Sequence, residues 1–161
     1  MTASRPNGAE RLLRLWSKLA PVPGGSWLFS RLLGFLVPYT GSIGAHVRIL
    51  EAGHARVTLR DRRAVRQHLG SVHAVALVNL GEVTTGLAML AGLPAGVRSI
   101  VTGLSIEYLK KARGLLSCDC RTLVPVVGTD VEHLVSGDIT DRAGDVVARI
   151  QVRWRLSPPK A

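Results

Sequence analysis

A long apolar stretch with one acidic residue inside it limits what this chain can fold into. Between residues 74 and 93 the only ionisable side chain is Glu82, and no other acidic residue lies between Asp61 and Glu107. The stretch predicts one long helix that begins near His73. A helix of this length could cross a bilayer, which needs about 20 apolar residues, or form the buried centre of a globular domain.

The segments on both sides of this stretch alternate as β-strands do. Every second residue between 54 and 60 is apolar, and the same pattern runs from Val146 to Leu156. An antiparallel sheet that is wet on one face must cover its other face, and wrapping it around the helix buries both apolar surfaces. We therefore prefer a globular α+β fold to a membrane span. Further strands are predicted at residues 46–50, 99–109, 115–124 and 131–140, with tight turns at residues 111–114, 128–130 and 141–144.

Two helices are predicted before the sheet. Residues 10–20 place leucines and a tryptophan on one face, and a second, apolar helix at residues 26–37 should end at Pro38. We expect this second helix to lie over the domain. The chain start lacks a secretory pattern, which predicts a cytoplasmic protein. The chain then divides into an N-terminal tail with helices, one sheet-and-helix domain and a C-terminal tail, at residues 1–44, 45–156 and 157–161.

The charge of the chain points to an anionic partner. The net charge is +10, and 17 of the 21 basic residues are arginine, the side chain that best matches phosphate oxygens. A nucleic acid, a membrane surface, a phosphate-bearing cofactor and a merely solvated basic surface all fit this composition. Aromatic residues make up only 4% of the chain, which argues against stacking on single-stranded nucleic acid. The two cysteines, Cys118 and Cys120, lack a metal-binding spacing and are expected to be free, buried thiols.

The order of elements resembles the hotdog fold, an antiparallel sheet wrapped around one long central helix, here with extra N-terminal helices. Within it, Gln67, His73 and Glu82 resemble a motif of the acyl-CoA thioesterases of the phenylacetate-pathway and hydroxybenzoyl-CoA type. These enzymes carry an Asn or Gln, then His-Gly-Gly six residues later, then an acidic residue nine residues after the histidine. Both intervals match. The two glycines are replaced by Ala74 and Val75.

This resemblance implies a thioesterase that hydrolyses an acyl-CoA, or a related acyl thioester, to a free acid and a thiol. Glu82 would act as general base or nucleophile, Gln67 would hold water or the carbonyl group, and His73 would position the substrate. The Ala74 N–H, at the positive end of the helix, would bind the thioester oxygen. Coenzyme A enters only as part of the substrate, and no metal is expected. The site would form across a homodimer interface, and two dimers could pair into a homotetramer.

Basic residues near this motif are candidates for the phosphates of coenzyme A. The first group stands at the end of a predicted strand and its turn, and the second lies beside the motif; they are Lys110, Lys111 and Arg113, and Arg62, Arg63 and Arg66. Lysines and arginines at such places also occur simply as solvated sheet edges.

Other functions and other roles fit the same residues. Glu82 could instead pair with a buried arginine, His73 could only cap the helix, and Gln67 could be a plain loop residue. A hotdog hydratase or dehydratase uses a histidine and a carboxylate fourteen residues apart, which His68 and Glu82 match, although the prolines of that motif are missing. A non-catalytic module that binds acyl thioesters or lipids is the third interpretation.

Overall fold

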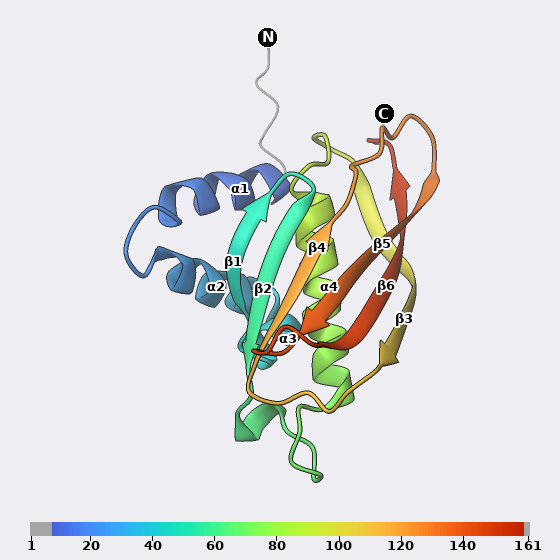
Figure 1. Cartoon of the computed structure of the whole chain (residues 1–161). Coiled ribbons are helices and arrows are strands. Elements are labelled where there is room, and N and C mark those ends of the chain that lie inside the picture. Colours follow the sequence, from blue (N-terminus) through green and yellow to red (C-terminus); the bar gives the residue numbers. More distant parts are fainter. Residues whose placement is uncertain (1–7, 160–161) are drawn as a thin grey trace.

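The structure is a computed structural model that describes residues 8–159 (Figure 1). The helices are α1 (Gly8–Leu19), α2 (Gly25–Leu36), α3 (Pro38–Ser42) and α4 (Ala74–Leu90), with a 3₁₀ turn at Arg63–Val65. The strands are β1 (His46–Glu51), β2 (His54–Arg60), β3 (Arg98–Tyr108), β4 (Leu115–Arg121), β5 (Val131–Thr140) and β6 (Val146–Ser157). Residues 1–7 and 160–161 of the predicted tails lie outside the described residues.

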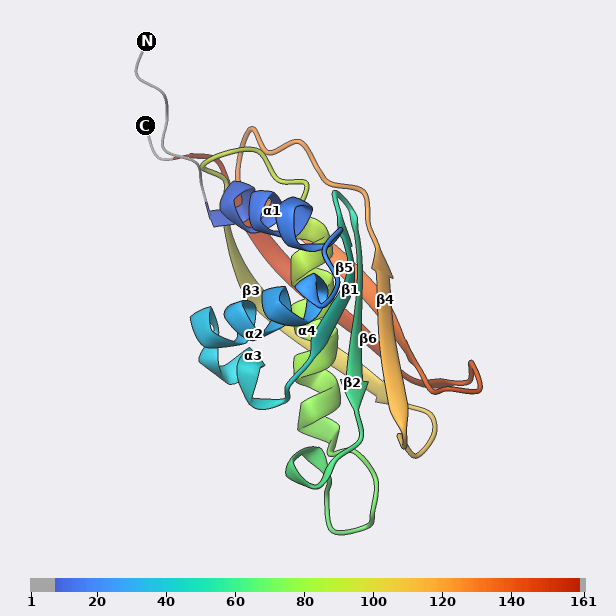
Figure 2. The ribbon, with the colours of Figure 1, turned by 90° about the vertical axis from the view of Figure 1, so that its left-hand side faces the viewer.

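A single antiparallel sheet curves around α4, as the alternating patterns predicted. The strand order is β1-β2-β4-β5-β6-β3, and Figure 2 shows α4 between the N-terminal helices and strands β1, β2 and β4, with β3 passing behind it. Apolar residues of α4 such as Leu80 meet the inward residues of β2 and β6, including Val57 and Ile150, all of them fully buried. This arrangement confirms the predicted hotdog fold.

The helix and the sheet approach most closely at Gly81. A Cβ atom at this position would lie 2.5 Å from Cδ1 and 2.6 Å from Cγ2 of Ile150 in β6. Carbon atoms at van der Waals contact are about 3.5–4.0 Å apart, so only glycine fits here without displacement. The polar residues on the sheet side of the helix, Thr84 and Thr85, are buried and satisfy their hydroxyl groups within α4, by donating to the carbonyl groups of Leu80 and Gly81.

One connection and one strand end differ from the prediction. β3 pairs with β6 and not with β4, so residues 111–114 lie on a crossover from the sheet edge to its middle, and the prediction of a tight turn there was wrong. β4 ends at Arg121 instead of residue 124. Just beyond it, the Thr122 N–H donates to the Gly53 carbonyl at 2.8 Å, and Pro125 has no N–H to offer a ladder.

The two edge strands of the sheet differ in whether another element covers them. The β1 edge is covered by α2, because the Ser30 hydroxyl accepts a hydrogen bond from the Val47 N–H at 2.9 Å. The β3 edge has no neighbour among the described residues, and it carries exposed apolar side chains such as Ile100, which is 63% exposed, and Leu104. A long apolar edge strand of this kind is a site for pairing with another strand.

The N-terminal helices form as predicted, with one correction at Pro38. This proline does not only end α2; it also occupies the first turn of α3, where its missing N–H costs nothing and its fixed φ suits a helix. The two helices touch backbone to backbone, since a Cβ at Gly41 would lie 2.2 Å from the Gly34 carbonyl oxygen. None of the helices in the described part of the chain is both long and apolar enough to span a membrane.

Candidate active site

The amino end of α4 carries a backbone amide that is not used by the fold. His73 is the N-cap residue, and its Nδ1 accepts a hydrogen bond from the Val75 N–H at 3.1 Å. The Ala76 N–H donates to the His73 carbonyl at 2.9 Å. The Ala74 N–H finds no acceptor among the described residues, and Ala74 is exposed. The helix therefore presents one free donor, with the positive end of its dipole, to solvent.

The loop before this helix is a tight hairpin built around Gln67. The Gln67 amide donates to the Ser71 hydroxyl at 2.9 Å, and its Oε1 accepts from the Leu69 N–H at 3.0 Å. Gly70 closes the turn with a φ of 74°, a conformation open to glycine. Gln67 is therefore engaged in its own loop, and His68 stands exposed at the tip of the hairpin, which projects beyond the end of α4 in Figure 2.

A carboxylate fixes this hairpin to the crossover that joins β3 to β4. Asp61, whose side chain is 5% exposed, accepts hydrogen bonds from Arg66 Nε at 2.6 Å and from the Gly114 N–H at 3.1 Å. The crossover holds the hairpin at two further points, because Arg113 Nε donates to the Gly70 carbonyl and the Val72 N–H donates to the Ala112 carbonyl. The bond from Arg66 is the main reason that the pKa of Asp61 lies below its usual range, with burial acting in the opposite direction.

Replacement of Asp61 by asparagine should lower the thermal unfolding midpoint by a few degrees at pH 7. A carboxylate whose pKa is lowered by folding stabilises the protein above its unfolded pKa, and this contribution is lost as the pH falls through the folded value. The difference between wild type and Asp61→Asn should therefore begin to shrink below about pH 4, near the unfolded pKa, and disappear as the pH falls through the lower folded value. Unfolding midpoints measured from pH 7 to pH 3 test this, with Asp130→Asn, an exposed residue, as control. Equal differences at both ends of the range would contradict it.

Tyr108 also reaches the start of the helix, although no sequence pattern pointed to it beyond its place on a predicted strand. Its hydroxyl donates to the Ala74 carbonyl at 3.2 Å from the end of β3. Burial raises the pKa of this phenol, which keeps it a donor over the whole neutral range. A cavity of about 260 Å³ lies between α3 and the helix start, and the residues that line it include His73, Val75 and Asn79 but not Tyr108.

Glu82 lies on α4 away from the helix start and has no partner in the described chain. It is half-buried, and neither a hydrogen bond to its carboxylate nor an ion pair with an arginine is formed by the described residues. The alternative of a structural acid paired with a guanidinium group therefore finds no support in this fold. Val75, Val78 and Glu82 follow at helical spacing and are the more exposed residues of the amino-terminal half of α4.

Within one chain, the predicted site residues fall into two groups. Gln67, His73 and Ala74 gather at the amino end of α4, whereas Glu82 follows Ala74 by eight residues, or about 12 Å of helix rise. Both an attacking base and an oxyanion donor must lie about 3 Å from the reacting atoms. One chain alone does not bring Ala74 and Glu82 to the same carbonyl group.

The basic residues predicted to bind phosphate differ in how available they are. Lys110 Nζ contacts Asp141 at 2.8 Å and Asp145 at 2.5 Å, so its charge is already neutralised by the turn between β5 and β6. Lys111 and Arg113 are exposed on the crossover beside the Gln67 hairpin. In the second group, Arg66 is paired with Asp61.

The comparisons with known proteins agree with this architecture. Among solved structures, a structural-genomics protein is 28% identical to the chain, with a TM-score of 0.79 over 94% of this chain and 99% of that one. A protein from Pseudomonas aeruginosa, named a probable thioesterase, is 21% identical with a TM-score of 0.73, over 84% and 96% of the two chains. A thioesterase from Haemophilus influenzae is 14% identical with a TM-score of 0.68, over 78% and 88%.

The sequence comparisons give the family. No curated protein sequence matches the chain. A family model described as "Domain of unknown function (DUF4442)" matches residues 25–156, which span α2, α3, the central helix and the whole sheet up to Leu156. With most of its length covered by this model, the chain belongs to the DUF4442 family, on a hotdog fold.

Proposed function

We propose that this protein is a thioesterase that hydrolyses an acyl-CoA, or a related acyl thioester, with Glu82 as the acid-base group and the Ala74 N–H as the oxyanion donor. The observation that carries this proposal is that α4 presents two unused groups: a free amide at its start and a carboxylate that has no structural partner. The solved hotdog structures named as thioesterases support the reaction class.

Hydrolysis at such a site follows from ordinary acyl-transfer chemistry. Glu82 takes a proton from water as the water oxygen attacks the carbonyl carbon. The carbonyl oxygen gains negative charge and accepts a hydrogen bond from the Ala74 N–H, where the helix dipole also favours an anion. The C–S bond then breaks, the proton on Glu82 passes to the departing sulfur, and the free acid and thiol remain. Direct attack by the Glu82 carboxylate, followed by hydrolysis of the anhydride, gives the same products.

A second copy of the chain would complete the site. The separation of about 12 Å along α4 is bridged if two copies pair at their open β3 edges, which brings their central helices together. Glu82 would then face Ala74 of the partner subunit. Exposed apolar side chains along β3, Ile100 and Leu104 among them, favour this pairing.

The diphosphate of coenzyme A would lie along the crossover between β3 and β4. Lys111 and Arg113 are exposed there, and Arg113 contacts the hairpin that carries Gln67. Guanidinium and ammonium groups bind phosphate oxygens by charge-assisted hydrogen bonds. Lys110 contributes less because two aspartates already hold it.

Release of free thiol from a panel of saturated and aromatic acyl-CoA substrates tests the proposal. Burial raises the pKa of Cys118 and Cys120 to about 12, so the protein's own thiols should not react with the detection reagent at neutral pH. We expect turnover with at least one substrate class. Hydration of an enoyl thioester without thiol release would instead favour the hydratase interpretation with His68. Binding of acyl-CoA without any reaction would favour the non-catalytic module.

A further inference from the structure

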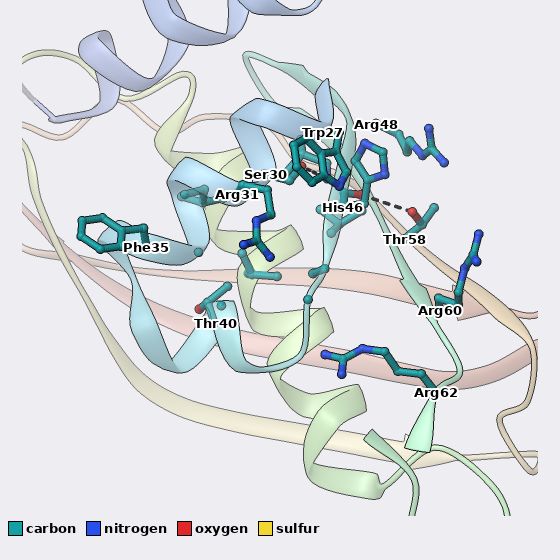
Figure 3. A pocket seen from close by; sticks show the side chains of 18 of the residues that line it. Trp27, Ser30, Arg31, Phe35, Thr40, His46, Arg48, Thr58, Arg60 and Arg62 are labelled. Atoms are coloured by element: carbon teal, nitrogen blue, oxygen red, sulfur yellow. Dashed lines mark hydrogen bonds between the residues drawn. The ribbon is translucent and has the colours of Figure 1, made fainter. Parts of the chain in front are cut away.

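A second cavity of the described chain lies away from the candidate active site. It has a volume of about 820 Å³ and lies among α2, α3, the first two strands and the middle of α4 (Figure 3). Val83 is the residue of α4 that lines it, and none of Gln67, His73, Ala74 and Glu82 does. The cavity is therefore a second concave site, formed largely by the N-terminal helices and the β1 edge.

Four arginines surround this cavity without a compensating acid. They are Arg31, Arg48, Arg60 and Arg62, and neither an aspartate nor a glutamate lines the cavity. Arg31 lies 5.7 Å from the Trp27 ring centre, and Arg62 donates to the Ser42 carbonyl at 3.3 Å. Carboxylate partners within 4.0 Å are absent for all four among the described residues. Concentrated positive charge in a concave site attracts anions strongly.

The arginines approach the cavity from different elements. Figure 3 shows Arg31 extending from α2 toward Thr40 and Arg62 extending from the segment after β2 toward the connection between α3 and β1, with Arg48 and Arg60 on the strand side. His46 adds no charge at neutral pH, because burial, and secondly the charge of Arg48, lower its pKa. The positive charge of the site therefore comes from guanidinium groups, which bind phosphate or carboxylate in a bidentate manner.

Hydrogen bonds hold the wall between the helix and the strand in place. The Ser26 hydroxyl and His46 Nε2 lie 3.0 Å apart, and the Ser30 hydroxyl both accepts from the Val47 N–H and donates to the Ser26 carbonyl at 2.7 Å. The Thr58 hydroxyl donates to the His46 carbonyl at 3.3 Å. The cavity is thus present before any ligand binds, which reduces the entropy cost of binding.

The rest of the lining combines a few small polar side chains with an apolar wall, and it lacks the groups that recognise a nucleotide. Val47 and Val57 are buried in the wall, and Leu33 and Val83 are half-buried beside them. Carboxamide and carboxylate side chains, which usually bind a base or a ribose, are missing from the lining. An apolar chain attached to an anionic group satisfies both parts of this surface.

We propose that the cavity between α2, β1 and α4 binds an anionic amphiphile, a single acyl or alkyl chain that ends in a carboxylate or a phosphate, with Arg31 and Arg62 holding the anionic group. The chain lies against the apolar wall formed by Leu33, Val57 and Val83. This site is separate from Glu82 and does not depend on the thioesterase proposal.

Titration calorimetry with three ligands of equal chain length tests the proposal. The purified full chain is titrated with laurate, dodecyl phosphate and the neutral monolaurin, each below the concentration at which it forms micelles. We expect one or both anionic ligands to bind at least about tenfold more tightly than monolaurin. The stronger of the two identifies the anionic group. Equal binding of monolaurin, or no binding of either anion, would overturn the proposal.

Two pairs of substitutions separate a specific site from general charge attraction. Arg31→Gln combined with Arg62→Gln should weaken the anionic ligand about tenfold or more. Arg121→Gln combined with Arg142→Gln, at two exposed arginines away from the cavity, removes the same charge and should change affinity by less than about twofold. Equal losses in both pairs would overturn the proposal. Glu82→Gln should leave this binding unchanged, so its outcome is independent of whether the chain hydrolyses thioesters.

Discussion

Replacement of Glu82 by glutamine should reduce thiol release from an acyl-CoA substrate by about 10²–10⁴-fold, the usual contribution of a positioned acid-base group. Glutamine keeps the shape of the side chain but neither accepts the proton of water nor attacks the thioester. The fold should persist, because the Glu82 carboxylate forms no hydrogen bond or ion pair within the described chain. Initial rates at saturating substrate, together with the unfolding midpoint, provide the measurement.

The matched control is Glu132→Gln. Glu132 is exposed on β5 and lies 3.9 Å from Arg153, so the same chemical change there should leave the rate within about twofold, as expected for a weak surface pair. Thiol release by Glu82→Gln at the wild-type rate would remove this residue from the reaction.

A mixture of two variants would show whether the site is shared. Glu82→Gln removes the acid-base group, and Gln67→Ala removes the two hydrogen bonds that hold the hairpin before Ala74, so we expect each to have little activity alone. If Glu82 of one chain acts with the hairpin and helix start of another, a dimer of one Glu82→Gln chain and one Gln67→Ala chain contains one intact site. Refolding the two variants together should then restore part of the activity that neither has alone. Activity that stays absent after mixing, in dimers shown to exchange chains, would place the whole site within one chain.

Gly81→Ala should destabilise the protein by about 1–3 kcal/mol, the usual range for overpacking a core. In an open helix the same substitution stabilises by up to about 1 kcal/mol. The sign is reversed here because the added Cβ would lie 2.5–3.0 Å from three side-chain atoms of Ile150. Urea unfolding at a fixed protein concentration gives the free energy.

A second substitution tests whether the contact with Ile150 causes the loss of stability in Gly81→Ala. Ile150→Ala alone should cost about 2–5 kcal/mol, but it removes the Cγ2 and Cδ1 atoms that collide with a Cβ at Gly81. Only the Cβ of residue 150, at 3.0 Å, then remains close, so in that background Gly81→Ala should cost much less than in the wild type and the free energies of the two substitutions should be strongly non-additive. The control is Gly86→Ala, where the nearest atoms belong to the Trp154 ring at 3.2–3.3 Å and the loss should be smaller. Additive free energies would show that another contact makes Gly81 necessary.

Most of the fold followed from local patterns in the sequence. The alternating segment from Val146 to Leu156 forms a strand whose apolar residues are buried from Ala148 onward. A two-residue period with one solvent-exposed face fixes which side chains of the strand point to the core. The long apolar stretch returned as α4 because an antiparallel sheet needs an apolar partner. The positions of Pro38 and β3 were less predictable, since a proline suits both a helix end and a helix start, and strand order depends on long-range pairing.

The sequence allowed the candidate site residues to be proposed, but not the contacts that they form. The intervals between Gln67, His73 and Glu82 suggested the motif, and the structure has His73 at the start of α4 and Gln67 in the hairpin before it. Sequence alone did not reveal that Gln67 is bonded to its own loop, because both bonds depend on the Gly70 turn. The arginine-lined cavity was also missed, since its four arginines come from α2, β1, β2 and the segment after β2, and only the fold brings them together.

Because α2 covers the β1 edge, the sheet can add further strands from another molecule at its β3 edge. A strand ladder with two open edges can add further copies without limit, as in a fibre. Here the Ser30 hydroxyl already occupies a donor of β1, and among residues 8–159 only β3 leaves its ladder open. Joining two molecules at β3, as proposed above, would use up that ladder and leave a covered strand at each outer end. Strand addition at β3 would therefore stop after one step.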